Sequence, residues 1–411
     1  MPTNRSFNLM GLPTEILYEI AQRLRLRSDM RDPGREPLRD IAQPILHQHF
    51  PLMTSVGRDH ARIFQFVRTL IERPDLAKGV RILGLDYSIP DRISFSSQFF
   101  KLLPPTGPAL AAQYNLEHPS NGSDDGQILE FVRQLVLCLA SEVHCVNVAG
   151  LTNHNIAFVH HTGIDEQHVP NSSLEKLTRL RVTGESFYPF PRQFSERKPS
   201  CLLLAHVTTL EMTYSTDMIH VMQGFTYPIH WDVITRLDFV FCYSLGPFFE
   251  SILDNCPKLQ QLTYISGDGV TAHDRPPAEW VRPSFYNVHG NSVTPSQIFQ
   301  VFPIAPDNPL QDLRALVLEY PNEDWLWGPT LRPLTMLTSL EKIYLSSRAL
   351  YGIRIPFRTV PLAEILPAGI RHLGIFQIDT YPRSISEDLA NLAERVVEFP
   401  HLRHVTLHNP R

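Results

Sequence analysis

Histidine and carboxylate side chains gather in one short stretch of the sequence where they could hold a metal ion. The group comprises His154, His160, His161, Asp165, Glu166 and His168. Protein zinc sites draw on such side chains, but they combine them with cysteines or with a recognisable ligand spacing. Neither occurs in this stretch. It therefore indicates a solvated loop, and we expect no bound metal.

Other catalytic signatures are missing from the sequence. It contains no G-x-S-x-G, no H-E-x-x-H, no P-loop and no dinucleotide fingerprint. Asp124 and Asp125 lie in polar sequence and are interpreted as surface charges rather than as an acid–base pair. We predict that the chain is not an enzyme and has no cofactor. An enzyme that uses the histidine-rich stretch would instead lose its activity when His160 and His161 are replaced.

Composition and charge narrow the class of partner. Lys and Arg number 37 and Asp and Glu 42 among 411 residues, for a net charge of −5 without long runs of one sign. A nucleic-acid binder normally carries a basic patch, so binding to nucleic acid is not expected. Neither a secretory signal nor a stretch long enough to span a membrane is found. We expect a cytoplasmic or nuclear protein, whose five cysteines are reduced.

A six-residue pattern, apolar-x-x-apolar-x-apolar, recurs ten times. The sextets begin at Val80, Val143, Leu177, Val207, Ile234, Leu259, Leu313, Leu340, Ile370 and Leu402. Seven of the nine spacings lie between 25 and 34 residues, and the other two are 63 and 54. Such a period predicts a solenoid, in which each sextet ends in a short strand with its apolar residues inward.

Helical patterns precede several sextets, over Ile128–Ala140 and from Ser386 onward, where Leu389, Leu392, Ala393 and Val396 form one stripe. Strands that alternate with helices at this period predict an α/β fold of the leucine-rich-repeat type, with mostly parallel strands and outer helices. The unit from Ile234 to Leu245 resembles the cysteine-containing class of these repeats, which predicts a buried Cys242.

The middle strand residue of each repeat is predicted to point outward on the concave face. In order, these residues are Asn147, Arg181, Glu211, Asp238, Thr263, Val317, Tyr344, Gly374 and Thr406. A row of mixed polar and aromatic side chains suits a protein partner better than a polyanion. Arg181, Glu211, Asp238 and Tyr344 are the candidate binding residues, although such residues can also be merely solvated.

Near the N-terminus, the sequence LPTEILYEIAQRL predicts a helix that begins at Leu12. Pro13 suits a first helical position, and Glu15 lies near the positive end of the helix dipole. The apolar stripe of this helix comprises Ile16, Leu17, Ile20, Ala21 and Leu24. Because so short a helix is marginal alone, either the body of the protein or a partner must cover the stripe.

A charged loop, Arg27–Pro37, follows this helix, and LRDIAQPILHQHF over Leu38–Phe50 then resumes a helical pattern that Pro44 kinks or ends. LPTEILYEIAQRL resembles the opening of the F-box, and an F-box ahead of irregular leucine-rich repeats resembles the large group of fungal F-box proteins. LRDIAQPILHQHF and the run Phe66–Leu85 are also similar to sequences of that group. The family usually has an aliphatic-rich helix where Arg27–Pro37 lies, so the F-box here is shortened.

The resemblance divides the chain into an F-box-like helical segment, 9–50, and an irregular leucine-rich-repeat domain, 51–411. Within that domain, residues 267–293 are loop-like and form either a functional insertion or a drifted repeat. The resemblance implies the substrate-recruiting subunit of an SCF-type cullin-RING ubiquitin ligase, whose F-box binds the Skp adaptor and through it a cullin. By position, the adaptor-binding residues are Leu12, Pro13, Ile16, Leu17, Ile20 and Leu24. The alternative is a repeat scaffold that binds a protein without any ligase.

Overall fold

The structure is a computed structural model. It describes residues 49–52, 60–86, 107–114, 116, 119, 125–149, 175–183, 206–213, 231–242, 253, 255–266, 310–320, 331, 333–351, 360–376 and 382–408. The chain forms two compact units, one of residues 1–148 and 157–177 and the other of residues 149–156 and 178–411. Much of the predicted F-box-like segment and the whole 267–293 insertion lie outside the described residues.

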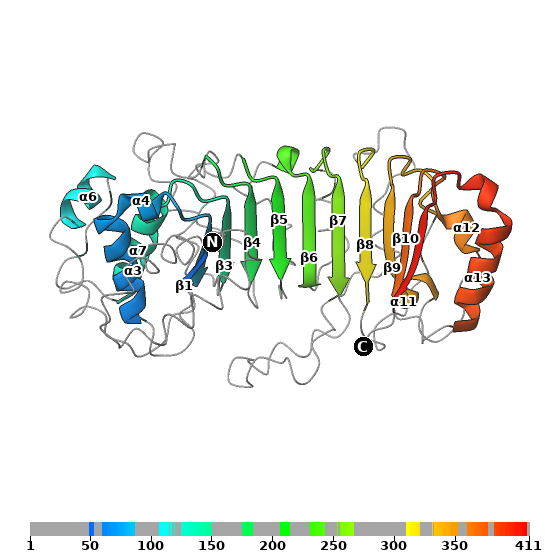
Figure 1. The fold of residues 1–411 in the computed structure, drawn as a ribbon, viewed down its shortest axis with the longest axis horizontal. Helices are drawn as coiled ribbons and strands as arrows, with labels where there is room; N and C mark the ends of the chain where they lie inside the picture. The colour runs from blue at the N-terminus through cyan, green and yellow to red at the C-terminus, as the bar shows by residue number, and fades with distance from the viewer. Residues whose placement is uncertain are drawn as a thin grey trace, which may run out of the picture. The chain divides into compact units, whose positions relative to one another are not determined.

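The first unit combines short parallel strands with helices. Its strands follow the order β1 (His49–Leu52), β2 (Ile82–Asp86) and β3 (Cys145–Ala149). Its helices are α3 (His60–Glu72), α4 (Pro74–Ala77), α6 (Gly107–Gln113) and α7 (Asp125–Leu139). Helices α3 and α7 lie side by side (Figure 1). Both bury apolar side chains, among them Leu70 and Leu135. Helix α7 confirms the helix predicted over Ile128–Ala140.

Strand β1 contradicts the last two residues of the helical pattern that was predicted over Leu38–Phe50. The sequence predicted helical spacing up to Phe50, but His49–Leu52 is a strand that pairs in parallel with β2. Pro51 has no N–H to donate to a ladder, so it is tolerated mainly in edge strands. Strand β1 is at the end of the strand order, where only one of its sides is paired.

The second unit is built on a ladder of parallel strands, which Figure 1 shows side by side from β4 to β11. The strands are β4 (Arg179–Thr183), β5 (Thr209–Thr213), β6 (Arg236–Cys242), β7 (Gln261–Ser266), β8 (Ala315–Glu319), β9 (Lys342–Ser346), β10 (His372–Phe376) and β11 (His404–His408). Its helices are η6 (Trp231–Val233), α11 (Ser347–Tyr351), α12 (Leu362–Ile365), α13 (Pro382–Glu394) and η10 (Val396–Glu398).

The ten predicted repeat strands are confirmed as β2 to β11, and each begins at the third residue of its sextet. The same hydrogen-bond pattern recurs between repeats of the second unit. The carbonyl of Thr178 accepts the N–H groups of both Thr208 and Thr209, at 2.9 and 3.0 Å. Corresponding pairs of N–H groups are accepted by Thr208, Thr235, Gln260, Arg314, Glu341 and Arg371. This shared carbonyl fixes the residue at which each strand starts. The first residue of nearly every sextet, which precedes that carbonyl in the sequence, is fully buried.

Helix α13 confirms the last predicted helix but not the predicted stripe. The helix begins at Pro382 rather than Ser386, and its buried positions include Ile385, Asp388 and Leu392. Val396, predicted to be part of the stripe, is 55% exposed. The helix ends at Glu394, so Val396 lies in η10 and no longer follows the helical period. In the described part of the chain, no helix has the length and apolar character needed to cross a membrane.

Candidate protein-binding face

The strand register aligns the fifth residues of the sextets in one row across the second unit. The third residue of each sextet lies on the same side of its strand, and we call the two rows together the outward face. Arg181 is the Cα partner of Glu211, and Glu211 is that of Asp238. The row continues through Thr263, Val317, Tyr344, Gly374 and Thr406. The predicted order of this row is therefore confirmed from Arg181 to Thr406, and the place of Asn147 at its start stays a prediction.

One end of the outward face carries two acidic and two basic side chains on β4 to β6. Arg181 Nη2 on β4 donates to Glu211 Oε2 on the adjacent strand β5 at 2.8 Å. Arg236 Nε donates to Asp238 Oδ2 at 2.6 Å, within one strand. Residues two apart on a strand share a face, which explains how Arg236 reaches Asp238. The cluster of Arg181, Glu211, Arg236 and Asp238 therefore has no net charge, although each member is charged.

Asp238 is unusual in this cluster because it is 5% exposed. Its Oδ1 atom is buried and has no hydrogen-bond partner, and the same is true of Arg181 Nε. A buried carboxylate oxygen without a donor is costly, since it has lost water and gained nothing. The buried oxygen is therefore a cost to the fold that no described contact offsets.

The other end of the outward face is aromatic. The Tyr344 ring lies over Gly374, so that a Cβ at position 374 would be 2.2 Å from Tyr344 Cδ1. Residue 374 therefore needs to be glycine for the ring to lie flat on the strand. The ring of Phe376 is stacked with Tyr344 at 6.1 Å between centroids and contacts His408 at 5.1 Å. These rings form a platform that suits apolar or aromatic groups.

Cationic side chains lie at the starts of the strands that carry this aromatic platform and at the start of β8. Arg314, Lys342, Arg371 and Arg403 are exposed at the starts of β8 to β11. Glu341 lies among them, with Oε2 at 3.7 Å from Arg371 Nη1. His372 stacks on His404 at 4.8 Å. Burial lowers the pKa of His372, and the charges of His404, Lys342, Arg371 and Arg403 lower that pKa further.

The structure brings together only part of the predicted binding set. Arg181, Glu211 and Asp238 meet on adjacent strands, whereas Tyr344 lies three strands away, beyond β7 and β8. Arg236 and the histidines of β10 and β11 were not predicted. The third position of each sextet was the signal that could have identified them, because it shares a face with the fifth.

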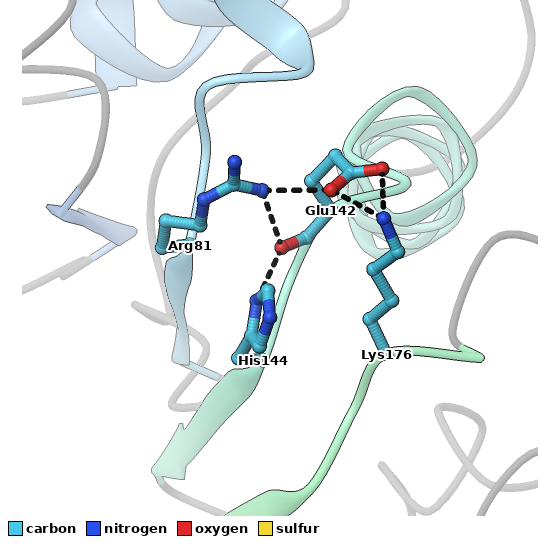
Figure 2. Close-up of polar contacts among 4 residues, drawn as sticks. All are labelled: Arg81, Glu142, His144 and Lys176. Carbon is cyan, nitrogen blue, oxygen red and sulfur yellow. Dashed lines mark hydrogen bonds and ion pairs between the residues drawn. The ribbon is translucent and has the colours of Figure 1, made fainter.

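The first unit contains a polar cluster centred on Glu142, which Figure 2 shows. Its carboxylate receives Lys176 Nζ at 2.6 and 2.7 Å and Arg81 Nη1 at 3.0 Å. Its backbone carbonyl accepts Arg81 Nη1 at 3.1 Å and lies 2.7 Å from His144 Nδ1. The bond from Lys176, with a smaller contribution from Arg81, lowers the pKa of Glu142 below its ordinary 4.5, although burial opposes this. The cluster links the turn after α7 to the starts of β2 and β3.

Replacing Glu142 by glutamine is expected to lower the thermal unfolding midpoint at pH 7, by no more than about 3 °C because exposed ion pairs are weak. A lowered carboxyl pKa in the folded state stabilises the fold above the unfolded pKa, and this contribution is lost as the pH falls through the folded value. The difference between wild type and variant should therefore shrink as the pH falls below the ordinary value of 4.5, and vanish once the carboxyl is protonated in the folded state. Glu175→Gln, at an exposed position nearby, is the control. A difference that persists at acid pH would contradict this role of the carboxylate.

The described cysteines are better explained as buried side chains of the core than as reactive thiols. Cys138, Cys145 and Cys256 are free thiols. Burial raises the pKa of Cys138 to about 12, and burial together with the charge of Asp232 raises that of Cys256 to about 12. Such thiols are poor nucleophiles. The side chain of Cys242, predicted to be buried, is not among those that the structure describes.

Several predicted sites fall outside the described residues. These are the adaptor-binding residues Leu12, Pro13, Ile16, Leu17, Ile20 and Leu24, and the histidine-rich stretch from His154 to His168. Where side chains are described, no group of three or more His, Cys, Asp or Glu residues could hold a metal ion.

The fold and the outward face define an α/β protein with parallel strands and helices, carrying a charged and an aromatic surface on its second unit. No protein-family model matches the chain, and no curated protein matches it either. The function is therefore argued from the sequence and from this surface.

Proposed function

We propose that this chain is the substrate-recruiting subunit of an SCF-type cullin-RING ubiquitin ligase, active in the cytoplasm or nucleus. The strand ladder is an irregular leucine-rich-repeat solenoid, and its outward face binds the protein to be modified. The F-box-like segment, 9–50, binds the Skp adaptor and through it a cullin. The chain itself recruits and positions, and contributes no catalytic group.

The observation that carries this proposal is the composition of the outward face. Regular strands with a shared backbone acceptor hold its side chains rigidly, which lowers the entropy cost of binding a partner. Arg181, Glu211 and Asp238 offer charged hydrogen bonds, and Tyr344 with Phe376 offers an aromatic surface. Arginine and aromatic residues are the types that contribute most energy at protein interfaces. Protein recognition is thus the activity that suits this face best.

Capture of the purified full chain by the Skp adaptor tests the proposal. The change is Ile16→Asp with Ile20→Asp, which places two carboxylates in the apolar stripe of the predicted helix. We expect adaptor affinity to fall at least tenfold, because burying unpaired charges is costly. Tyr18→Asp with Gln22→Asp is the matched control, since it adds the same charge on the opposite face of that helix.

The outcomes separate the alternatives. Equal loss with both pairs of substitutions, or retained binding with Ile16→Asp and Ile20→Asp, would contradict the assignment of the adaptor-binding residues. A wild-type chain that unfolds cooperatively but does not bind the adaptor would favour the repeat scaffold without ligase association.

A further inference from the structure

The last strand of the ladder, β11, is the least covered strand among those described. Every one of its five residues is exposed. Val405 is 44% and Leu407 43% exposed, although their register partners Leu373 and Ile375 on β10 are buried. The apolar face of the sheet therefore continues onto β11 without cover.

Among the described strands, β11 pairs with β10 alone, so one of its backbone edges has no described partner. In a parallel ladder, alternate residues turn both of their backbone polar groups toward the neighbouring strand. His404 N–H donates to the carbonyl of Arg371 at 3.2 Å, which places His404, Thr406 and His408 on the side of β10. The N–H and C=O groups of Val405 and Leu407 must then point to the opposite, free edge. An edge of this kind is a template for pairing with another strand.

The sequence of β11 is nearly self-complementary. It reads His-Val-Thr-Leu-His, which is symmetric about Thr406 apart from the exchange of valine for leucine. An antiparallel copy centred on Thr406 would place Val405 opposite Leu407 of the other chain, and His404 opposite His408. The residues whose backbone groups are free would then form the hydrogen-bonded pairs of an antiparallel ladder.

We propose that two copies of this chain form a dimer through their β11 strands, which pair in an antiparallel manner about a two-fold axis at Thr406. An axis perpendicular to the sheet keeps the faces matched, so Val405 and Leu407 of both chains join one apolar surface. Four backbone hydrogen bonds form between the Val405 and Leu407 positions. The histidines of both strands gather on the opposite face, and no described acidic residue lies on either face of β11.

A cysteine at position 406 tests this geometry directly. In the dimer, Thr406 faces itself as a non-hydrogen-bonded pair, for which the Cα atoms lie about 4.5 Å apart, within the range that a disulfide bridges. Full-length Thr406→Cys should therefore form a covalent dimer under mild oxidation. His404→Cys is the matched control, because it lies on the same face of β11 but is about 13 Å from its own copy. Wild type gives the background from the native cysteines.

Mass measurement by light scattering provides the independent readout. We expect wild type to approach twice the monomer mass as its concentration rises. Val405→Lys with Leu407→Lys should weaken association at least tenfold, because charges on an edge strand oppose pairing. The unfolding midpoint at low concentration should not change, since both side chains are already half exposed.

The proposal would be overturned if wild type stays monomeric at high concentration, or if Thr406→Cys is cross-linked no more than His404→Cys. Species that keep growing beyond the dimer would also contradict it, because a two-fold contact closes after two copies. None of these results depends on binding to the Skp adaptor.

Discussion

Replacing Asp388 by alanine is expected to lower the free energy of unfolding by about 3 kcal/mol. Asp388 lies on α13 and is 9% exposed. Its Oδ2 accepts the hydroxyl of Tyr351 at 2.5 Å, and its Oδ1 accepts the N–H of Leu362 at 3.1 Å. One carboxylate thus joins α11, α12 and α13. Alanine removes the acceptor of two buried donors, and each donor left without one costs about 1–3 kcal/mol.

Chemical denaturation of the full chain measures this effect, and two further variants show its cause. Asp388→Asn keeps one acceptor oxygen and should cost about 1 kcal/mol, since only part of the hydrogen bonding is lost. Glu387→Ala changes an exposed residue of the same helix and should have little effect. If Asp388→Ala were no less stable than Glu387→Ala, the carboxylate would not hold these three helices together.

The repeat strands could be predicted from sequence because their signal is local and repeated. Each sextet specifies a buried first residue and a strand with two inward apolar residues, and the spacing between sextets then assigns the neighbouring strands. The adjacency of Arg181, Glu211 and Asp238 follows from that spacing and from the two-residue period of a strand. Strand β1 was missed because it owes its conformation to pairing with β2, which is about thirty residues away, while its own sequence contains Pro51.

Other features of the candidate site depend on contacts that the sequence does not specify. The position of Tyr344 over Gly374 requires the direction of a side chain as well as the register. The burial of Asp238 is a second example, because an aspartate at an outward position is expected to be exposed. The stripe of α13 failed because the helix ends before Val396 and because its buried face runs through Ile385, Asp388 and Leu392, which leaves Ala393 exposed. Periodicity therefore predicts which residues share a face of a helix or strand. The burial of that face and the direction of each side chain depend on the packed structure.

Asp238 provides the sharpest test that the outward face is selected for binding rather than for stability. Its buried Oδ1 atom has no donor, and its Cα partner Glu211 is a second carboxylate on the adjacent strand. Like charges at such positions destabilise a sheet. Asp238→Asn is therefore expected to raise the free energy of unfolding by about 1 kcal/mol, because the neutral amide removes the repulsion between two carboxylates and can still accept from Arg236.

Under the proposed function, the same substitution should weaken binding of the recruited protein at least tenfold. A lysine or arginine side chain of the partner, placed over this part of the outward face, would be attracted by the charge of Asp238 and would offset the repulsion from Glu211, and the neutral amide would lose that attraction. Denaturation and quantitative capture of the bound protein measure the two effects on one preparation. Gln261→Asn, at an exposed position on β7, is the control for both. A variant that is less stable than wild type, or equally able to bind, would show that Asp238 serves the fold alone. A site retained for recognition predicts that Asp238→Asn raises the free energy of unfolding and lowers the binding affinity, because a destabilising residue is retained only where function needs it.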